Sequence, residues 1–256
     1  MSSAVWVTRP GAAGERTRKA MESAGFAAFH LPLLRIEFQP PASAPSGTWA
    51  DLVVFVSANA VEGLERAAGT LGFPVPRRFR AAVIGARTRD RLAAAPWEVD
   101  LIAEANNGKA LLDAMAGIVD PGTRVWIPAG SRAGSARGLL PEALEREGAV
   151  VEVIPVYRTL DRTLEPGEEA VLAAREPGAV ICHSPSAAEA LHRAAASVAV
   201  RRWWDAATLV AVGETTAARL RSLGGVSVRA AAEPSDAGVA AVLDSIEAIQ
   251  PSGSDT

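Results

Sequence analysis

The stretch Val153-Ile-Pro-Val-Tyr-Arg-Thr-Leu160 has the character of an extended strand and carries the single tyrosine of the 256-residue chain. A similar stretch, Leu31-Pro-Leu-Leu-Arg-Ile-Glu-Phe38, lies in the first part of the chain. When Pro32 is aligned with Pro155, the arginines of the two stretches also coincide. The two stretches therefore indicate a duplication.

The duplication extends along both halves of the chain. Ser57–Leu64 resembles Ser184–Leu191, and Gly85–Thr88 resembles Gly213–Thr216. The offset between matched residues changes by only a few positions, as loop insertions would cause. Solenoid and propeller repeats are about 20 to 50 residues long, so a period near half the chain predicts two related domains.

Composition narrows the class of protein. With 49% hydrophobic and 21% charged residues, the chain can form globular domains that bury a core. It has 26 Lys and Arg residues against 29 Asp and Glu residues and contains no basic run, so we expect no nucleic-acid partner. No apolar run approaches the roughly 20 residues that cross a bilayer, and the N-terminus lacks the features of a signal peptide. We therefore expect no membrane partner and a soluble, cytoplasmic protein.

Short β-branched runs alternate with longer segments of helical periodicity, which predicts an α/β protein with parallel sheets. The first predicted unit is a strand at Ala4–Thr8, a helix over 13–24 that Gly25 ends, and a strand at Phe26–Leu31. The proline-rich segment Gln39–Trp49 has the composition of a connection. Further strands are predicted at Leu52–Ser57, Ala81–Gly85, Val99–Ile102, Arg124–Pro128, Ala179–His183, Thr208–Gly213 and Val226–Ala230.

Two arrangements of these elements fit the sequence. In the first, the halves form two consecutive lobes. In the second, the opening strand-helix-strand units are exchanged, so that residues 1–32 join 162–256, residues 50–150 form the other lobe, and the two similar stretches pair as crossing strands. Both stretches continue past the last sheet residue into extended, arginine-bearing sequence, which favours the second arrangement.

The common catalytic and nucleotide-binding motifs are absent from the sequence. It contains no GxGxxG, GxxxxGK[ST], GxSxG or HExxH pattern. His30, His183 and His192 lack carboxylate or cysteine partners at the spacing of metal ligands, which is more typical of packed or surface histidines. We therefore predict neither a metal nor a cofactor.

What recurs is a strand-to-helix turn made of small polar residues. Such turns occur at Thr8–Pro10, Ser57–Asn59, Gly85–Thr88, Pro128–Arg132, Ser184–Ser186 and Gly213–Thr216. In open parallel sheets the carboxyl ends of the strands line the ligand crevice, and helix N-termini offer unpaired N–H groups and about half a positive charge. Two facing lobes would thus surround a cleft rich in anion sites, although each residue alone is more typical of a helix cap.

Charged and aromatic residues accompany these turns. Arg9, Arg87, Arg132 and Arg158 fall in or beside the turns and the crossing strand, where they could neutralise several carboxylates. Tyr157 has two interpretations. It could pack as a half-buried aromatic on the strand pair, or its phenol could donate a proton at a site that polarises this weak acid.

The order and spacing of several motifs resemble the uroporphyrinogen-III synthase family along nearly the whole chain. The matching stretches are Val7–Pro10, Leu31–Leu33, Phe55–Val61, Val83–Thr88, Ile154–Thr159, His183–Ser186, Ala211–Ala217 and Ala232–Pro234. The resemblance implies two flavodoxin-like α/β lobes joined by a two-stranded antiparallel ladder. It divides the chain into a discontinuous lobe of residues 1–34 and 161–256, a lobe of residues 48–151, and connecting strands at 35–47 and 152–160.

The resemblance also implies an activity. The family cyclises hydroxymethylbilane, a linear tetrapyrrole with eight carboxylates, to uroporphyrinogen III in tetrapyrrole biosynthesis. Loss of the hydroxyl from the first ring gives an azafulvene, attack at the fourth ring gives a spiro intermediate, and rearrangement closes the macrocycle with that ring inverted. This lyase reaction releases water and requires no cofactor.

Carried over by position, the family's tyrosine on the crossing strand is Tyr157, which would help the hydroxyl depart. The residues expected to bind substrate are Thr8, Arg9, Ser57, Ala58, Thr88, Ser131, Arg132, Ser184, Ser186, Thr215 and Thr216. We expect a monomer that contacts the bilane-producing deaminase transiently. Two other hypotheses stay open: a two-lobed module that binds a small anion or tetrapyrrole without catalysis, and a regulatory homologue that has lost the activity.

Overall fold

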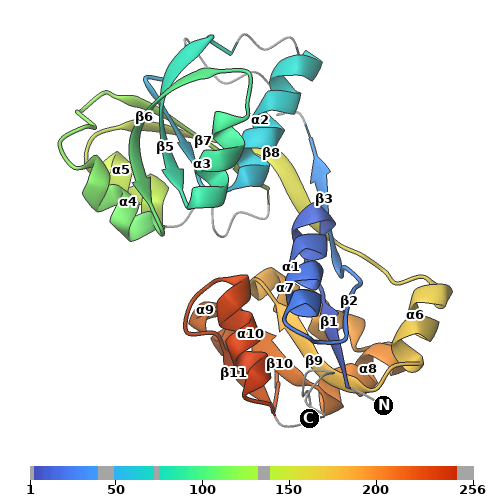
Figure 1. The fold of residues 1–256 in the computed structure, drawn as a ribbon. Coiled ribbons are helices and arrows are strands. Elements are labelled where there is room, and N and C mark those ends of the chain that lie inside the picture. The colour runs from blue at the N-terminus through green and yellow to red at the C-terminus, as the bar shows by residue number, and fades with distance from the viewer. Residues whose placement is uncertain (1–2, 40–48, 72–74, 132–138, 247–256) are drawn as a thin grey trace. The chain divides into compact units, whose positions relative to one another are not determined.

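The computed structural model describes residues 3–39, 49–71, 75–131 and 139–246. The chain divides into two compact units (Figure 1), one formed by Met1–Arg35 with Leu160–Thr256 and the other by Ile36–Thr159. We call them the discontinuous unit and the central unit. The chain passes between them within two strands, β3 (Leu34–Phe38) and β8 (Val150–Asp161).

The discontinuous unit contains a parallel sheet with the strand order β11-β10-β9-β1-β2. Its strands are β1 (Ala4–Val7), β2 (Ala28–His30), β9 (Pro177–Cys182), β10 (Thr208–Ala211) and β11 (Val228–Ala230). The N-terminal strand β1 lies between β2 and β9, because Trp6 pairs with Phe29 on one side and with Val180 on the other. Strands from both ends of the chain thus share one sheet.

Helices cover both faces of this sheet. Helices α1 (Gly11–Ser23) and α10 (Asp236–Asp244) contribute Met21, Val239 and Leu243 to the core on one face. The other face is covered by α6 (Pro166–Ala173), α7 (Pro185–Ala194), α8 (Val198–Ala206) and α9 (Glu214–Ser222). In that second layer the fully buried rings of Trp6 and Trp203 meet edge to face, with their centres 5.6 Å apart.

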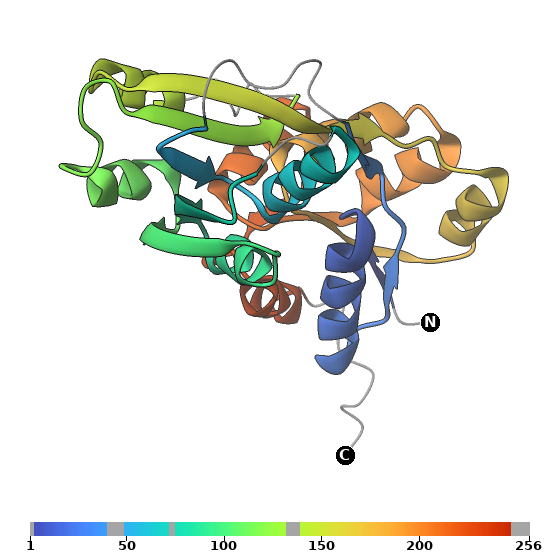
Figure 2. The ribbon, with the colours of Figure 1, turned by 90° about the horizontal axis from the view of Figure 1, so that it is seen from above.

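The central unit contains a sheet with the strand order β3-β8-β7-β4-β5-β6. Its other strands are β4 (Leu52–Phe55), β5 (Arg78–Ile84), β6 (Glu98–Ala105) and β7 (Arg124–Gly130). The strands from β8 to β6 run parallel, and Figure 2 shows the long strand β8 beside β7. Strand β3 pairs with β8 in the antiparallel sense, and just beyond β3 the Gln39 N–H donates to the Val156 carbonyl at 3.1 Å.

The central sheet is likewise covered on both faces. Helices α2 (Ala58–Leu71) and α3 (Ala86–Ala93) lie on one face, and α4 (Gly108–Met115) and α5 (Leu139–Arg146) lie on the other. Ala60, Val61 and Leu64 of α2 are fully buried in the core that also holds Phe55 of β4. Apolar residues at this spacing lie on one side of a helix, which explains why α2 packs on the sheet.

The predicted α/β fold, with parallel sheets and an antiparallel strand pair, is confirmed. Strand β6 is longer than the predicted Val99–Ile102, because it pairs with β5 from Glu98 to Ala105. Helices α6 and α8 are not anticipated by the sequence analysis. The predicted connection at Gln39–Trp49 lies largely outside the described residues.

Candidate active site

The candidate site of the central unit lies where its parallel strands end and its helices begin. Tyr157 lies on β8 at the level where β7 ends, and its phenol oxygen is 3.2 Å from the Ser57 hydroxyl oxygen. Ser57 follows β4 and precedes α2, and its hydroxyl oxygen accepts the Ala60 N–H at 3.1 Å. Ser57 therefore caps α2 and also contacts the single tyrosine of the chain.

The end of β7 leaves room for the tyrosine ring. Strand β7 lies between β8 and β4, so a side chain that reaches from β8 to Ser57 must pass over it. The last residue of β7 is Gly130, which pairs in register with Tyr157. A Cβ atom on Gly130 would lie 2.8 Å from Cε2 and 3.0 Å from Cζ of the ring. The exposed residue Ser131 follows, and its N–H donates to the Tyr157 carbonyl at 2.7 Å.

Aromatic and charged neighbours flank the half-buried Tyr157. The ring of Phe38 on β3 meets the tyrosine ring edge to face, with centres 6.4 Å apart. The Arg66 guanidinium lies 4.5 Å from the centre of the Phe38 ring. The next residue along β8, Arg158, forms an ion pair with Glu37 of β3. The Arg158 guanidinium is therefore engaged in an ion pair that links β8 to β3.

The other predicted residues of the central unit differ in their surroundings. Ala58 is the first residue of α2, so its backbone belongs to the turn whose N–H groups carry the partial positive charge of the helix. Thr88 is buried, and its hydroxyl donates to the Ile84 carbonyl at 2.7 Å. This hydrogen bond therefore ties the first turn of α3 to the end of β5. Arg132 lies outside the described residues.

In the discontinuous unit, β9 and β10 end side by side, and a helix with predicted site residues follows each strand. Ser184 caps α7 by accepting the Ala187 N–H at 3.2 Å, and Ser186 lies half-buried in the first turn. At the start of α9, Thr215 is exposed and Thr216 is buried. The sheet register thus brings Ser184, Ser186 and Thr215 to one edge of the sheet.

The turn after β1 is closely packed. Thr8 is fully buried, and its hydroxyl donates to the Ile181 carbonyl at 2.7 Å, which ties β1 to β9. His30 Nε2 lies 2.6 Å from the Arg9 carbonyl oxygen and donates to it, because a carbonyl can only accept. A Cβ atom on Gly14 would lie 2.0 Å from the same carbonyl oxygen. These contacts hold the backbone at the half-buried Arg9.

The structure also gathers a polar cluster that the sequence analysis misses. His183 follows β9, and its Nε2 lies 3.5 Å from the Thr17 hydroxyl and 3.9 Å from the Asp236 carboxylate. The Thr17 hydroxyl donates to Asp236 at 2.9 Å. The three residues come from distant segments of the chain, so no local motif marks them. The side chain of His183 is largely buried, as expected of a packed histidine, and it lies among polar groups.

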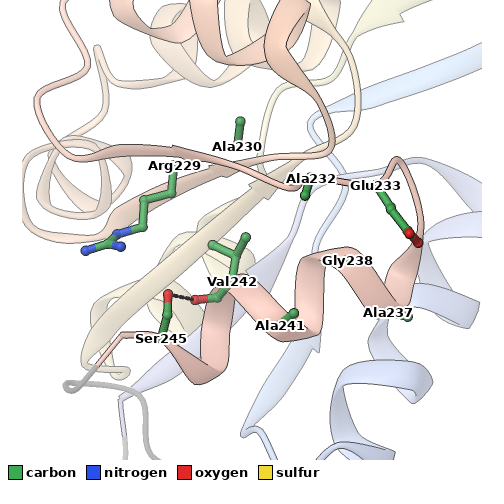
Figure 3. A pocket seen from close by; sticks show the side chains of 9 residues that line it. All are labelled: Arg229, Ala230, Ala232, Glu233, Ala237, Gly238, Ala241, Val242 and Ser245. Atoms are coloured by element: carbon green, nitrogen blue, oxygen red, sulfur yellow. Dashed lines mark hydrogen bonds between the residues drawn. The ribbon is translucent and has the colours of Figure 1, made fainter.

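A hollow of about 630 Å³ opens in the discontinuous unit between β11 and α10 (Figure 3). Mostly small side chains line it, with Arg229 and Glu233 at opposite ends in this view. The lining residues are Arg229, Ala230, Ala232, Glu233, Ala237, Gly238, Ala241, Val242 and Ser245. None of the residues predicted to bind substrate is among them, so the candidate site lies elsewhere.

Few groups in the described segments could support metal or thiol chemistry. Among the described residues, no cluster of three or more His, Cys, Asp or Glu side chains is placed to hold a metal ion. Burial raises the pKa of the Cys182 thiol to about 12. This thiol is therefore uncharged at neutral pH and a poor nucleophile.

Within the parts of the chain that the structure describes, no helix has the length and apolar character to cross a membrane.

Two parallel-sheet units connected by an antiparallel strand pair, with a tyrosine on one of the connecting strands, define a class of two-lobed α/β protein. A family model described as uroporphyrinogen-III synthase HemD matches residues 15–241 of the chain. The chain belongs to the uroporphyrinogen-III synthase family, as its motifs predict.

A curated relative supports this family assignment. A protein of Methanothermobacter thermautotrophicus named "Putative uroporphyrinogen-III synthase" is 33% identical over 171 residues, which are 64% of this chain and 66% of that protein. The chain thus spans just under two thirds of this relative's length.

Solved structures show the same fold at low identity. The uroporphyrinogen-III synthetase of Helicobacter pylori superimposes with a TM-score of 0.67 at 18% identity, covering 96% of this chain and 100% of that one. A mutant uroporphyrinogen III synthase of Thermus thermophilus gives a TM-score of 0.53 at 20% identity, with 94% and 97% covered.

Proposed function

We propose that the protein cyclises hydroxymethylbilane to uroporphyrinogen III, with inversion of the fourth pyrrole ring and loss of water. Its family membership supports this reaction and a place in tetrapyrrole biosynthesis. The observation that carries the proposal is the position of Tyr157, whose phenol oxygen lies 3.2 Å from the Ser57 hydroxyl at the start of α2. A proton donor held at a helix N-terminus suits a reaction that begins with the departure of a hydroxyl.

In the proposed reaction, the phenol of Tyr157 gives its proton to the departing hydroxyl, which leaves as water. General acids of this kind accelerate reactions by about 10²–10⁴-fold. The later steps make and break carbon–carbon bonds within the substrate itself. The protein's main task there is to hold the two ends of the bilane so that the spiro attack is faster than direct closure. The proposal requires no cofactor.

The carboxylates of the bilane would bind where helices begin. In the central unit we propose this role for Ser57, Ala58 and Ser131, and in the discontinuous unit for Arg9, Ser184, Ser186 and Thr215. Ser57 would contribute its backbone N–H, since its hydroxyl already contacts Tyr157. The other residues would contribute hydroxyl, guanidinium or backbone N–H groups. Together with the partial charge of each helix N-terminus, these donors supply the hydrogen bonds that carboxylates accept. The buried residues Thr8, Thr88 and Thr216 would act by holding their turns in place. Arg132 stays a prediction because it lies outside the described residues.

The isomer of the product tests the proposal. Hydroxymethylbilane closes spontaneously to uroporphyrinogen I, whereas the proposed enzyme gives uroporphyrinogen III. Purified protein would be mixed with freshly generated hydroxymethylbilane, and the uroporphyrins would be separated after oxidation. We expect mainly type III, with type I in a parallel reaction without protein. Type I alone from folded protein would reject the proposal and leave a binding module or an inactive regulatory homologue as the better account.

We also propose that the protein acts as a cytoplasmic monomer that meets the bilane-producing deaminase only transiently. A short transfer between the two proteins would limit spontaneous closure of the bilane to the type I isomer. Light scattering of the purified protein should give a mass near 26.5 kDa. The mass of a dimer would contradict the monomer.

A further inference from the structure

Two residues from separate parts of the central unit lie beside the side chain of Tyr157. Gly130 ends β7 beneath the tyrosine ring, and Ser57 lies beside the phenol oxygen. We propose that both are positioning residues for the proton donor: Gly130 leaves the space that the ring occupies, and Ser57 donates a hydrogen bond to the phenol oxygen. The inference rests on the proposed function, because it assigns roles around the same acid.

The contact at Gly130 is steric. A Cβ atom there would come within 2.8 Å of Cε2, 3.0 Å of Cζ and 3.3 Å of the phenol oxygen of Tyr157. Cβ atoms essentially never approach another heavy atom to less than 3.0 Å, so the ring would have to move. The ring is the free end of a side chain, whereas the backbone of β7 is paired with β8 and with β4. An alanine at Gly130 should therefore displace the phenol without unfolding the sheet.

The contact at Ser57 is a hydrogen bond whose direction follows from the chemistry. The Ser57 hydroxyl oxygen already accepts the Ala60 N–H, and a hydroxyl has one hydrogen to donate. An acid must keep its own hydrogen available for the substrate, so Ser57 donates and the Tyr157 oxygen accepts. This hydrogen bond becomes stronger as negative charge develops on the phenol oxygen. The partial positive charge at the start of α2 acts in the same direction.

Protons and electrons balance over the reaction. The O–H bond of Tyr157 breaks as its proton joins the departing hydroxyl, the carbon–oxygen bond of the substrate breaks with both electrons on oxygen, and water leaves. The phenolate that remains accepts the hydrogen bond from Ser57. The fourth ring loses one proton as the macrocycle forms, and this proton restores the phenol. No outside acid is consumed.

The position of the ring can be measured without substrate. Tyr157 is the single tyrosine of the chain, so protein made with ¹³C-labelled tyrosine gives one set of ring signals in NMR spectra. We expect G130A and S57A to change the chemical shifts of these signals. The matched variant G69A should leave them unchanged, because a Cβ atom on Gly69 meets nothing within 4 Å. Ring signals in G130A that match the wild type would overturn the role of Gly130.

Steady-state rates of the variants then distinguish a positioning role from a general effect on the fold. We expect G130A and S57A each to lower kcat about tenfold or more with little change in KM, since small misplacements of reacting groups cost up to about 10²-fold. S57T keeps the hydroxyl and the cap and should restore most of the rate. S235A removes the same kind of cap from α10, where Ser235 accepts the Gly238 N–H at 3.0 Å, and should leave kcat unchanged.

A double-mutant cycle with Y157F completes the test. If Gly130 and Ser57 act through the phenol, G130A and S57A should each lower kcat by less than about twofold in the Y157F protein. Equal losses with and without the phenol, or a Y157F protein as active as the wild type, would overturn the inference while the cyclising activity stands. Type I product from the wild type would instead reject the proposed function itself.

Discussion

The hydroxyl of Thr17 donates a hydrogen bond of 2.9 Å to the carboxylate of Asp236, although 219 positions separate the two residues in the chain. Thr17 is fully buried on α1, and Asp236 is the first residue of α10. Both helices contribute to the core on one face of the sheet of the discontinuous unit. The hydrogen bond therefore fastens the N-terminal strand-helix-strand segment to the C-terminal helix.

Replacing Thr17 by valine removes this hydroxyl and keeps the shape of the side chain. We expect T17V to lower the free energy of unfolding by about 1–3 kcal/mol, because Asp236 loses a donor in a partly buried place. Urea unfolding followed by tryptophan fluorescence measures the change. T208V is the matched control, since the Thr208 hydroxyl bonds to Ser227 at an exposed place, and its effect should stay within about 0.5 kcal/mol. Equal effects of the two variants would argue against a special role of Thr17.

A second prediction concerns the helix after the first turn. In G14A the new methyl group would lie 2.0 Å from the Arg9 carbonyl oxygen and 2.3 Å from His30 Nε2. The carbonyl is part of the backbone and cannot move aside cheaply, so we expect a loss of at least about 2 kcal/mol in unfolding free energy. G167A provides the control, because a Cβ atom there meets nothing within 4 Å. A G14A protein as stable as G167A would show that the turn can relax.

Glu168 should contribute to the pH dependence of the free energy of unfolding. Its carboxylate pairs with the Arg162 guanidinium and accepts the Glu165 N–H at 2.9 Å. The hydrogen bond from Arg162, and next the one from the Glu165 backbone, lower the pKa of Glu168 from its ordinary value. A carboxyl group of this kind stabilises the fold above its unfolded pKa of about 4.3, and this stabilisation is lost as the pH falls through the folded pKa.

The variant E168Q isolates the charge, because glutamine keeps an oxygen for the Glu165 N–H. At pH 7 we expect E168Q to be less stable than the wild type by about 1 kcal/mol or less, since both members of the ion pair are only partly buried. The difference should shrink once the pH falls below the folded pKa of Glu168, where the wild-type carboxyl is also uncharged. Denaturant unfolding over a pH series measures it, and a difference that does not change with pH would contradict the assignment.

Cys182 should be unreactive in the folded protein. Burial raises the pKa of its thiol to about 12, and its side chain lies in the core of the discontinuous unit. Thiol reagents attack the thiolate, so native protein at about pH 8 should react far more slowly than protein unfolded in urea. Rapid labelling of the native protein would mean that this core opens readily.

The proposed acid is tested by Y157F, which removes the phenol oxygen and keeps the ring. We expect kcat to fall about 100-fold, in the range that general acids supply. The KM for hydroxymethylbilane should change little, because the proposed carboxylate donors are other groups. Steady-state assays of type III product give both constants. Turnover equal to that of the wild type would remove Tyr157 as the acid.

Much of the fold can be predicted from the sequence, because the signals are local. Strand and helix periodicity depend on residues close together in the chain, and so do helix caps such as Ser57 and Ser184. A local signal for α6 was available as well, since Pro166 stands at its start and Glu168 follows Glu165 at capping-box spacing. The length of β6 could not be predicted from a local signal, because β6 extends as far as its pairing with β5 allows.

The sequence by itself determined that the chain forms α/β units with parallel sheets, and that its single tyrosine stands on a strand. Only the tertiary structure decided which residues meet. Strand β7 lies between β8 and β4, so Tyr157 must cross Gly130 to reach Ser57. The physical reason is that strand order comes from backbone pairing between distant segments, so a contact across strands depends on the whole sheet and not on neighbouring residues.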